Sequence, residues 1–153
     1  MFTNLPLTPL SVTKILAYVH YYTPNFLPGR CLPAGRLRAL AAHLGFPHPT
    51  LRSARAHPLL AAHLALAHAA DLLTVTAGYW QTTPFTRQWL ASKWTAQIGK
   101  LQQARMQEER WQQALATLSL ETVFNIDYLA YIDQQLDRAR RAAPAAYGRA
   151  RRL

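Results

Sequence analysis

Residues 68–90 read HAADLLTVTAGYWQTTPFTRQWL, and the spacing of the apolar side chains changes twice within this stretch. Before it, leucines and alanines recur at helical spacing. Residues 73–76 then alternate apolar and polar side chains as a β-strand does, and Gly78 supplies a turn residue. Helical spacing returns after Thr83 and Pro84, which pair an N-cap residue with a first-turn proline. The sequence therefore predicts one short β-hairpin between helices.

Helices are predicted on both sides of this hairpin, because apolar residues recur there every three or four positions. The three helices before it cover residues 7–22, 34–45 and 57–70. Gly45 suits the end of the second helix, and Pro58 suits the start of the third. After the hairpin, a fourth helix is predicted over residues 84–118, which contain no helix breaker. Ser119 is the expected cap of a last helix over residues 120–141.

Charge is distributed unevenly along the 153 residues, whose formal net charge is +10. The first 70 residues contain no carboxylate side chain, acidic residues cluster in the second half, and an arginine-rich segment ends the chain. The basic residues of the first part are Lys14, Arg30, Arg36, Arg38, Arg52 and Arg55. A basic, acid-free first domain and the arginine-rich end of the chain indicate a polyanionic partner for these two parts. The alternative is a charge that serves only solubility.

Other bulk features indicate an intracellular chain. Cys31 is the one cysteine, so an internal disulfide is excluded and a reduced compartment fits best. The N-terminal sequence lacks the basic region and apolar run of a signal peptide. The most apolar run, HPLLAAHLALAHAADLL, is interrupted by histidines and is too short to span a bilayer. We expect a cytoplasmic, nucleoid-associated protein with no membrane partner.

The order of helix, helix, helix, hairpin and helix resembles that of the winged helix-turn-helix superfamily. LRALAAHLG is similar to its second helix, and HLALAHAADLLTVT to its third helix running into the first wing strand. GYWQTTPFTRQWL is similar to the second wing strand and the next helix. The resemblance covers roughly residues 10–95. It departs from the usual pattern at Asp71, where such proteins often have glycine, and in a longer, proline-rich link before the third helix.

This resemblance implies a mainly α fold and three segments along the chain. A winged helix-turn-helix domain, made of three helices and a short β-hairpin wing, is expected over residues 8–95. A C-terminal segment of long helices, for dimerisation or partner binding, is expected over residues 96–142. Residues 143–153 are expected to form a basic, disordered tail.

The resemblance also implies binding to duplex DNA, with the third helix in the major groove and the wing near the backbone. The base-reading positions then fall on Pro58, Leu59, Ala61 and Ala62, which carry no hydrogen-bonding side chains, so direct readout of bases is poor. The polar, basic and aromatic side chains around these elements are the candidate DNA-binding residues. They are Lys14, Arg36, Arg38, His48, Thr50, Arg52, Ser53, Arg55, His57, His63, Tyr79, Trp80 and Gln81.

Two of these assignments have open alternatives. Arg52 and Arg55 are expected to clamp phosphates or to reach guanine edges, but a solvated helix face also accounts for them. Trp80 is a candidate for a groove contact, and a hydrophobic cap on the hairpin is the favoured alternative.

The C-terminal helices are expected to bind a partner protein rather than DNA, because their acidic residues repel phosphates. A homodimer formed through them would match a palindromic site. The alternative is that they fold back onto their own domain. The predicted partner interface consists of Trp94, Ile98, Leu101, Trp111 and Leu115.

Catalysis and metal binding find little support in the sequence. His43 and His48 are five residues apart, as are His63 and His68, whereas two ligands on one helix face need a spacing of three or four. Sequence motifs for nucleophilic, phosphate-binding or metalloprotease sites are missing. We therefore expect neither a metal nor another cofactor, and no enzymatic activity.

The leading hypothesis is a small, non-enzymatic DNA-binding protein, either a transcription regulator or a mobile-element accessory factor. The second is a structural or assembly subunit of a larger nucleoprotein complex, with the winged helix contacting protein or RNA. In a third, weaker hypothesis the protein is all-helical and LLTVTAGYWQT is a loop.

Overall fold

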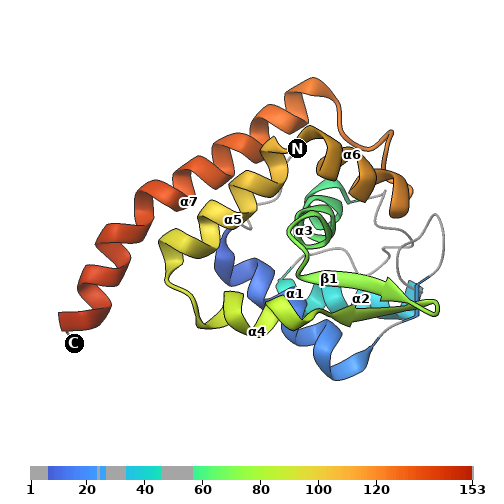
Figure 1. Ribbon diagram of the computed structural model, residues 1–153, viewed down its shortest axis with the longest axis horizontal. Coiled ribbons are helices and arrows are strands. Elements are labelled where there is room, and N and C mark those ends of the chain that lie inside the picture. The colour runs from blue at the N-terminus through green and yellow to red at the C-terminus, as the bar shows by residue number, and fades with distance from the viewer. Residues whose placement is uncertain (1–6, 24, 27–33, 46–56, 153) are drawn as a thin grey trace.

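The computed structural model describes residues 7–23, 25–26, 34–45 and 57–152, the last ten of these and residues 34–35 by their backbone alone. These residues form seven helices and one two-stranded hairpin (Figure 1). The elements in chain order are α1 (Pro9–Tyr22), α2 (Ala34–Leu44), α3 (Pro58–Ala69), β1 (Leu73–Thr76), β2 (Tyr79–Thr82), α4 (Pro84–Ala91), α5 (Trp94–Met106), α6 (Glu108–Thr117) and α7 (Ile126–Arg152). The fold is mainly α, and the predicted hairpin is present between α3 and α4.

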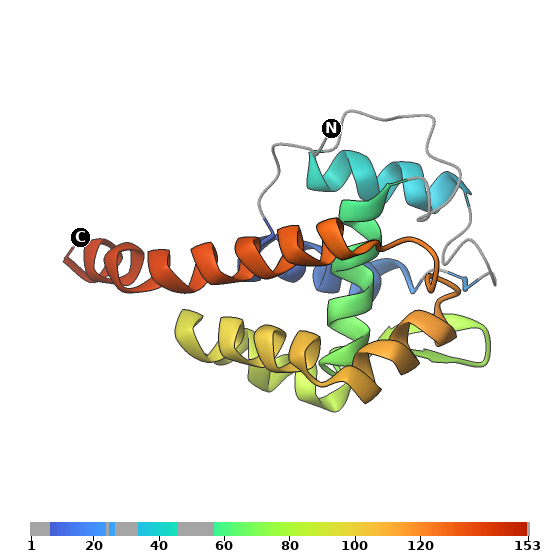
Figure 2. The same cartoon turned by 90° about the horizontal axis from the view of Figure 1, so that it is seen from above.

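Helix α3 lies at the centre of the molecule. Its sequence, PLLAAHLALAHA, is apolar on all sides, and a helix of that kind has to be buried. Every residue from Leu59 to Ala67 is buried. Helices α1, α5 and α6 and strand β1 pack against α3, so that other elements surround it (Figure 2).

Helix α1 begins with a capping box, in which the side chains of Thr8 and Ser11 each accept a hydrogen bond from the other's backbone N–H. Ile15, Leu16 and Val19 of α1 are buried. Tyr22, one turn after Val19 at the end of the helix, is 55% exposed. Tyr18, one turn earlier, is buried against α2, and its hydroxyl donates to the Arg36 carbonyl at 3.3 Å.

Helix α3 ends at Asp71 in a Schellman motif. The Asp71 N–H donates to the His68 carbonyl at 3.1 Å, and the Leu72 N–H donates to the Ala67 carbonyl at 2.9 Å. Asp71 has φ +60°, the left-handed conformation that glycine usually adopts. Its carboxylate is bound by Arg110 of α6 at 2.7 Å. Asp71, which stands where winged-helix proteins often have glycine, therefore links the end of α3 to α6.

The hairpin pairs β1 with β2 in antiparallel register, with Val75 opposite Trp80. Ala77 and Gly78 both have positive φ values, +52° and +81°, as the two-residue type I′ turn requires. Trp80 is fully buried, and its ring lies edge-on to the rings of Phe26 and His68. The hairpin is therefore anchored by one indole.

Helix α4 is tied to the end of α3 by the threonines of its own capping box. The Thr83 hydroxyl donates to the Asp71 carbonyl, and the Thr86 hydroxyl donates to the Leu72 carbonyl at 2.7 Å. These bonds fix where the chain leaves the hairpin.

The predicted fourth helix over residues 84–118 is wrong, because the chain forms α4, α5 and α6 instead. Ser92 is extended between α4 and α5, and its hydroxyl donates to the Gln88 carbonyl at 2.8 Å. The Trp89 indole donates to the Gln97 carbonyl at 3.2 Å, and the Gln97 side chain donates back to the Trp89 carbonyl at 3.0 Å. This reciprocal pair holds α4 against α5. A second extended residue, Gln107, separates α5 from α6.

The last helix also differs from its prediction at both ends. Ser119 has φ +57° and closes a second Schellman motif at the end of α6, so it does not cap α7. The Asn125 side chain accepts from the Tyr128 N–H at 2.8 Å and caps α7 instead. The α7 backbone is helical to Arg152 and projects beyond α5 (Figure 1).

We predict that Ala77→Asn raises the free energy of unfolding by about 0.5–1 kcal/mol, because asparagine tolerates the left-handed conformation better than alanine does. Ala77→Val is the control and should destabilise the protein, since β-branched residues are strained at positive φ. Urea denaturation followed by circular dichroism measures both values. An unchanged midpoint in both variants would contradict the type I′ turn.

Candidate nucleic-acid interface

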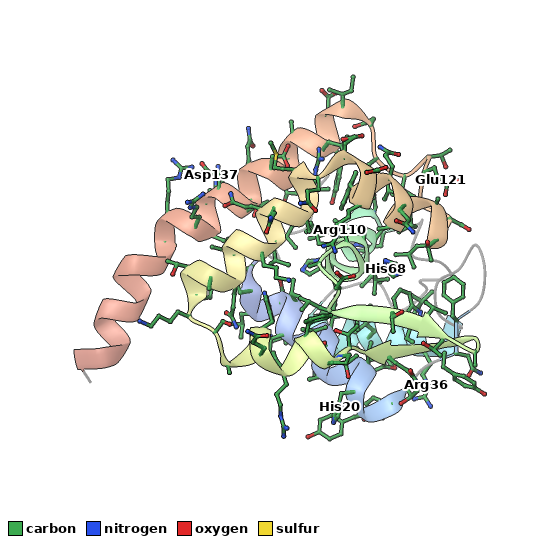
Figure 3. All side chains as sticks on the ribbon, in the orientation of Figure 1. His20, Arg36, His68, Arg110, Glu121 and Asp137 are labelled. Atoms are coloured by element: carbon green, nitrogen blue, oxygen red, sulfur yellow. The ribbon has the colours of Figure 1, made fainter. Side chains whose placement is uncertain are left out.

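The outer side of α1 is an exposed, largely aromatic surface between α2 and α4. Tyr21 is 80% exposed and Tyr22 is 55% exposed. Figure 3 shows His20 and Arg36 on this side of the molecule. We call this surface the α1 face, and it consists of Ala17, His20, Tyr21 and Tyr22 of α1, Arg36 and His43 of α2, Gln81 of β2, and Arg87 and Leu90 of α4.

A first hollow of about 350 Å³ lies between α1 and α2. Its rings are in tilted contact: the centroid of Tyr18 lies 4.8 Å from that of Tyr22 and 6.2 Å from that of His43. The Arg36 guanidinium carbon lies 5.3 Å from the centroid of the Tyr22 ring, which is a cation–π contact. The hollow thus combines flat aromatic walls with a cation at its edge.

A second hollow of about 430 Å³ lies between α1 and α4. Arg87 and Leu90 of α4 line one wall, and His20 lines the opposite wall on α1. Tyr21 lines both hollows, and its ring lies at 74° to that of His20 with the centroids 5.6 Å apart. A smaller hollow of about 210 Å³ continues from His20 to Gln81 on β2.

The α1 face contains no acidic side chain, since Asp71 is the only side-chain carboxylate before residue 108. Glu121 and Asp137 lie across the molecule from His20 and Arg36 (Figure 3). The ion pairs among the described residues all lie outside the α1 face; they join Arg105 to Asp133, Arg110 to Asp71 and Arg141 to Asp137. Negative charge is therefore confined to the side of α6 and α7.

Five of the predicted DNA-binding residues are at least partly accessible. Arg36 and Arg38 are exposed on α2, Tyr79 and Gln81 are exposed on β2, and Lys14 is half-buried on α1. Of these, only Arg36 and Gln81 line the hollows of the α1 face. A further five predicted residues lie outside the described part of the chain: His48, Thr50, Arg52, Ser53 and Arg55.

The sequence also predicts His57, His63 and Trp80 at a DNA interface, and the structure places all three in the core instead. His57 is 5% exposed, and the other two are fully buried. The expected reading helix, α3, is inaccessible for the same reason, because Leu59 is 2% exposed and the following alanines are buried. For Trp80, the structure agrees with the favoured alternative of a hydrophobic anchor for the hairpin.

His63 joins α3 to α1 through two buried hydrogen bonds. Its Nδ1 lies 2.7 Å from the Leu59 carbonyl, and its Nε2 lies 2.7 Å from the Ser11 hydroxyl. A carbonyl only accepts, so Nδ1 carries the proton of the neutral ring and Nε2 accepts from Ser11. Burial lowers the pKa of His63 from 6.5 to about 4. His63 is therefore a neutral, structural histidine.

The predicted partner interface packs within the chain itself. Ile98 and Leu101 are fully buried, and Trp111 and Leu115 are 1% and 4% exposed. Trp94 is partly buried, and its indole donates to the carbonyl of Ala139 in α7 at 2.7 Å. These side chains are covered by their own chain, as in the alternative in which the C-terminal helices fold back onto their own domain.

Sequence reasoning missed Tyr21, His20, His43 and Arg87 as surface residues of one site. A signal was present in AYVHYY, where tyrosines recur at positions 18, 21 and 22 of a predicted helix. The spacing of three and four shows that these rings share a side of the helix, but not which of them stays outside.

Protein family models, curated proteins and solved structures were compared with the chain, and none of them matches it. Among the described residues, no group of three or more His, Cys, Asp or Glu side chains is placed to hold a metal ion. No helix in this part of the chain combines the length and the hydropathy that a membrane span requires.

We predict that lowering the pH below 6.5 destabilises the protein through His63. The pKa of His63 is about 4 in the folded state and 6.5 when solvated, so between these values only the unfolded chain takes up the proton. The free energy of unfolding should therefore fall by up to about 1.4 kcal/mol per pH unit between pH 6.5 and pH 4.

Urea denaturation at pH 7, 6 and 5 measures this slope, and His63→Gln should reduce it because glutamine does not titrate. Burial also lowers the pKa of His68, so a smaller slope of the same sign should remain in the variant. An identical slope in His63→Gln and the parent would show that His63 does not carry the effect.

Proposed function

We propose that this chain is a non-enzymatic nucleic-acid-binding protein, which holds the phosphate backbone against the α1 face. The single observation that carries the proposal is the absence of side-chain carboxylates from every element of a face on which Arg36 and Arg87 are exposed. Arginine on an acid-free surface attracts phosphate without competition from neighbouring acids.

In fold terms, we propose a variant of the winged helix-turn-helix arrangement. The order of three helices followed by a hairpin supports this. In this variant α3 forms the core, and α1, α2 and α4 supply the binding surface. Because Leu59, Ala61 and Ala62 are buried and Pro58 has no hydrogen-bonding side chain, binding should rest on phosphate contacts and have little dependence on base sequence.

The position of the acidic residues supports a single binding side. Glu108, Glu109, Glu121 and Asp127 are exposed on α6 and at the start of α7. Phosphates are repelled from α6 and the start of α7 and attracted to the α1 face. The same face would serve a regulator, a mobile-element factor or a subunit of a nucleoprotein complex.

We predict that the dissociation constant for nucleic acid rises steeply with salt, and that replacing Arg36 and Arg87 with alanine flattens this dependence. Each phosphate contact contributes about 0.9 to the slope of log K against log salt for duplex DNA, and about 0.7 for a single strand. The slope of the double variant should therefore be shallower by about 1.8 for duplex DNA, or by about 1.4 for a single strand. Fluorescence anisotropy with labelled 20-nucleotide oligonucleotides, at salt concentrations between 50 and 300 mM, measures this slope.

Arg141→Ala is the matched control, because it removes the same charge from an exposed α7 residue that is paired with Asp137. It should leave the slope close to that of the parent protein. No binding of either single-stranded or duplex oligonucleotide at 50 mM salt would overturn the proposed function. An equal loss of slope in the control would show that binding follows net charge and not the α1 face.

A further inference from the structure

Tyr21 is the most exposed large apolar or aromatic side chain on the α1 face, at 80%. Large aromatic rings are usually at least half-buried in a folded domain, because burying them stabilises it. Here Tyr21 lines two hollows, and its ring meets the His20 ring edge-on with the centroids 5.6 Å apart, so an exposed ring lies beside mainly apolar space. This is the geometry of a stacking platform for planar groups.

Each hollow beside Tyr21 carries both an aromatic or imidazole group and an arginine. The hollow toward α2 has Tyr22 with the Arg36 guanidinium over its ring. The hollow toward α4 has His20 and Arg87. Planar bases stack on aromatic rings and guanidinium groups, while the phosphates that join them need nearby cations.

We propose that the α1 face binds single-stranded nucleic acid, with a base stacked on the exposed ring of Tyr21 and the neighbouring phosphates held by Arg36 and Arg87. This inference rests on the proposed function and narrows its ligand to single strands. In a duplex the base faces are covered by their neighbours, so a duplex can use only the arginines and not the Tyr21 ring. Stacking does not depend on the identity of the base. This agrees with the burial of Leu59, Ala61 and Ala62, which leaves α3 without side chains that could read bases.

The charge pattern selects a nucleic acid over a protein segment as the occupant. Most protein surfaces carry both signs of charge, so a protein partner would set some of its cations against the arginines of the α1 face. The α1 face offers cations, imidazoles and hydroxyls but no carboxylate, so it is complementary to a polyanion with flat apolar groups.

Fluorescence anisotropy with a labelled 20-nucleotide oligo(dT) and with a labelled 20-base-pair duplex tests the inference at 100 mM salt. The parent protein should bind the single strand at least tenfold more tightly than the duplex. Tyr21→Ala should weaken single-strand binding about tenfold, since stacking on one ring is of this size, and should leave duplex binding unchanged. Tyr21→Phe keeps the ring and should restore the affinity.

Phe85→Ala is the matched control, because Phe85 is also an exposed ring, at 54%, but lines neither hollow. It should bind both oligonucleotides as the parent does. As a second measurement, an oligonucleotide containing 5-iodouracil should, on irradiation, crosslink to the peptide that contains Tyr21 and Tyr22. Thermal melting should show that Tyr21→Ala keeps the parent's stability.

The outcomes separate this inference from the proposed function. Equal binding of duplex and single strand, or full single-strand affinity in Tyr21→Ala, would overturn base stacking. The proposed function would stand in that case as long as the Arg36 and Arg87 variant still loses salt dependence. Failure to bind either oligonucleotide overturns both.

Discussion

The burial of α3 is the constraint on which the rest of the structure depends. A twelve-residue helix whose sides are nearly all leucine and alanine can be stable only where other elements cover every side of it. Helices α1, α5 and α6 and the hairpin provide that cover, and His63 adds a polar link to α1 in place of an apolar contact. Because α3 is almost wholly buried, any binding site has to be built from the other elements.

The junction at Asp71 determines how the covering elements are placed around α3. Its left-handed backbone turns the chain from the helix into β1, its carbonyl accepts from Thr83 at the start of α4, and its carboxylate binds Arg110 on α6. Glycine would make the same turn with less strain but would have no carboxylate for α6. Because this acidic group is held by Arg110, it does not oppose the positive charge of the α1 face.

Local signals predicted local structure well, and long-range contacts account for the errors. The alternation in residues 73–76, Gly78 and the Thr83–Pro84 start each indicate a conformation that the neighbouring backbone alone favours, and all are present. The breaks at Ser92 and Gln107 have no such signal, since the sequence there favours helix. The first is stabilised by the Trp89–Gln97 pair, eight residues apart. Burial of Trp111 and Leu115 likewise depends on α3, which a stripe on one helix does not reveal.

The candidate site was predictable in its charge and not in its position. The lack of acids in the first part of the chain indicates a polyanion whatever the fold is, but choosing the binding surface requires knowing which side of each helix is covered. The apolar start of α3, which lacks groups that read bases, already weighed against groove recognition, and its burial explains that composition. Because α3 is buried, the accessible acid-free surface consists of the outward tyrosines of α1 with Arg36 and Arg87 beside them. A polyanion bound there meets aromatic rings as well as cations, which favours ligands that expose their bases.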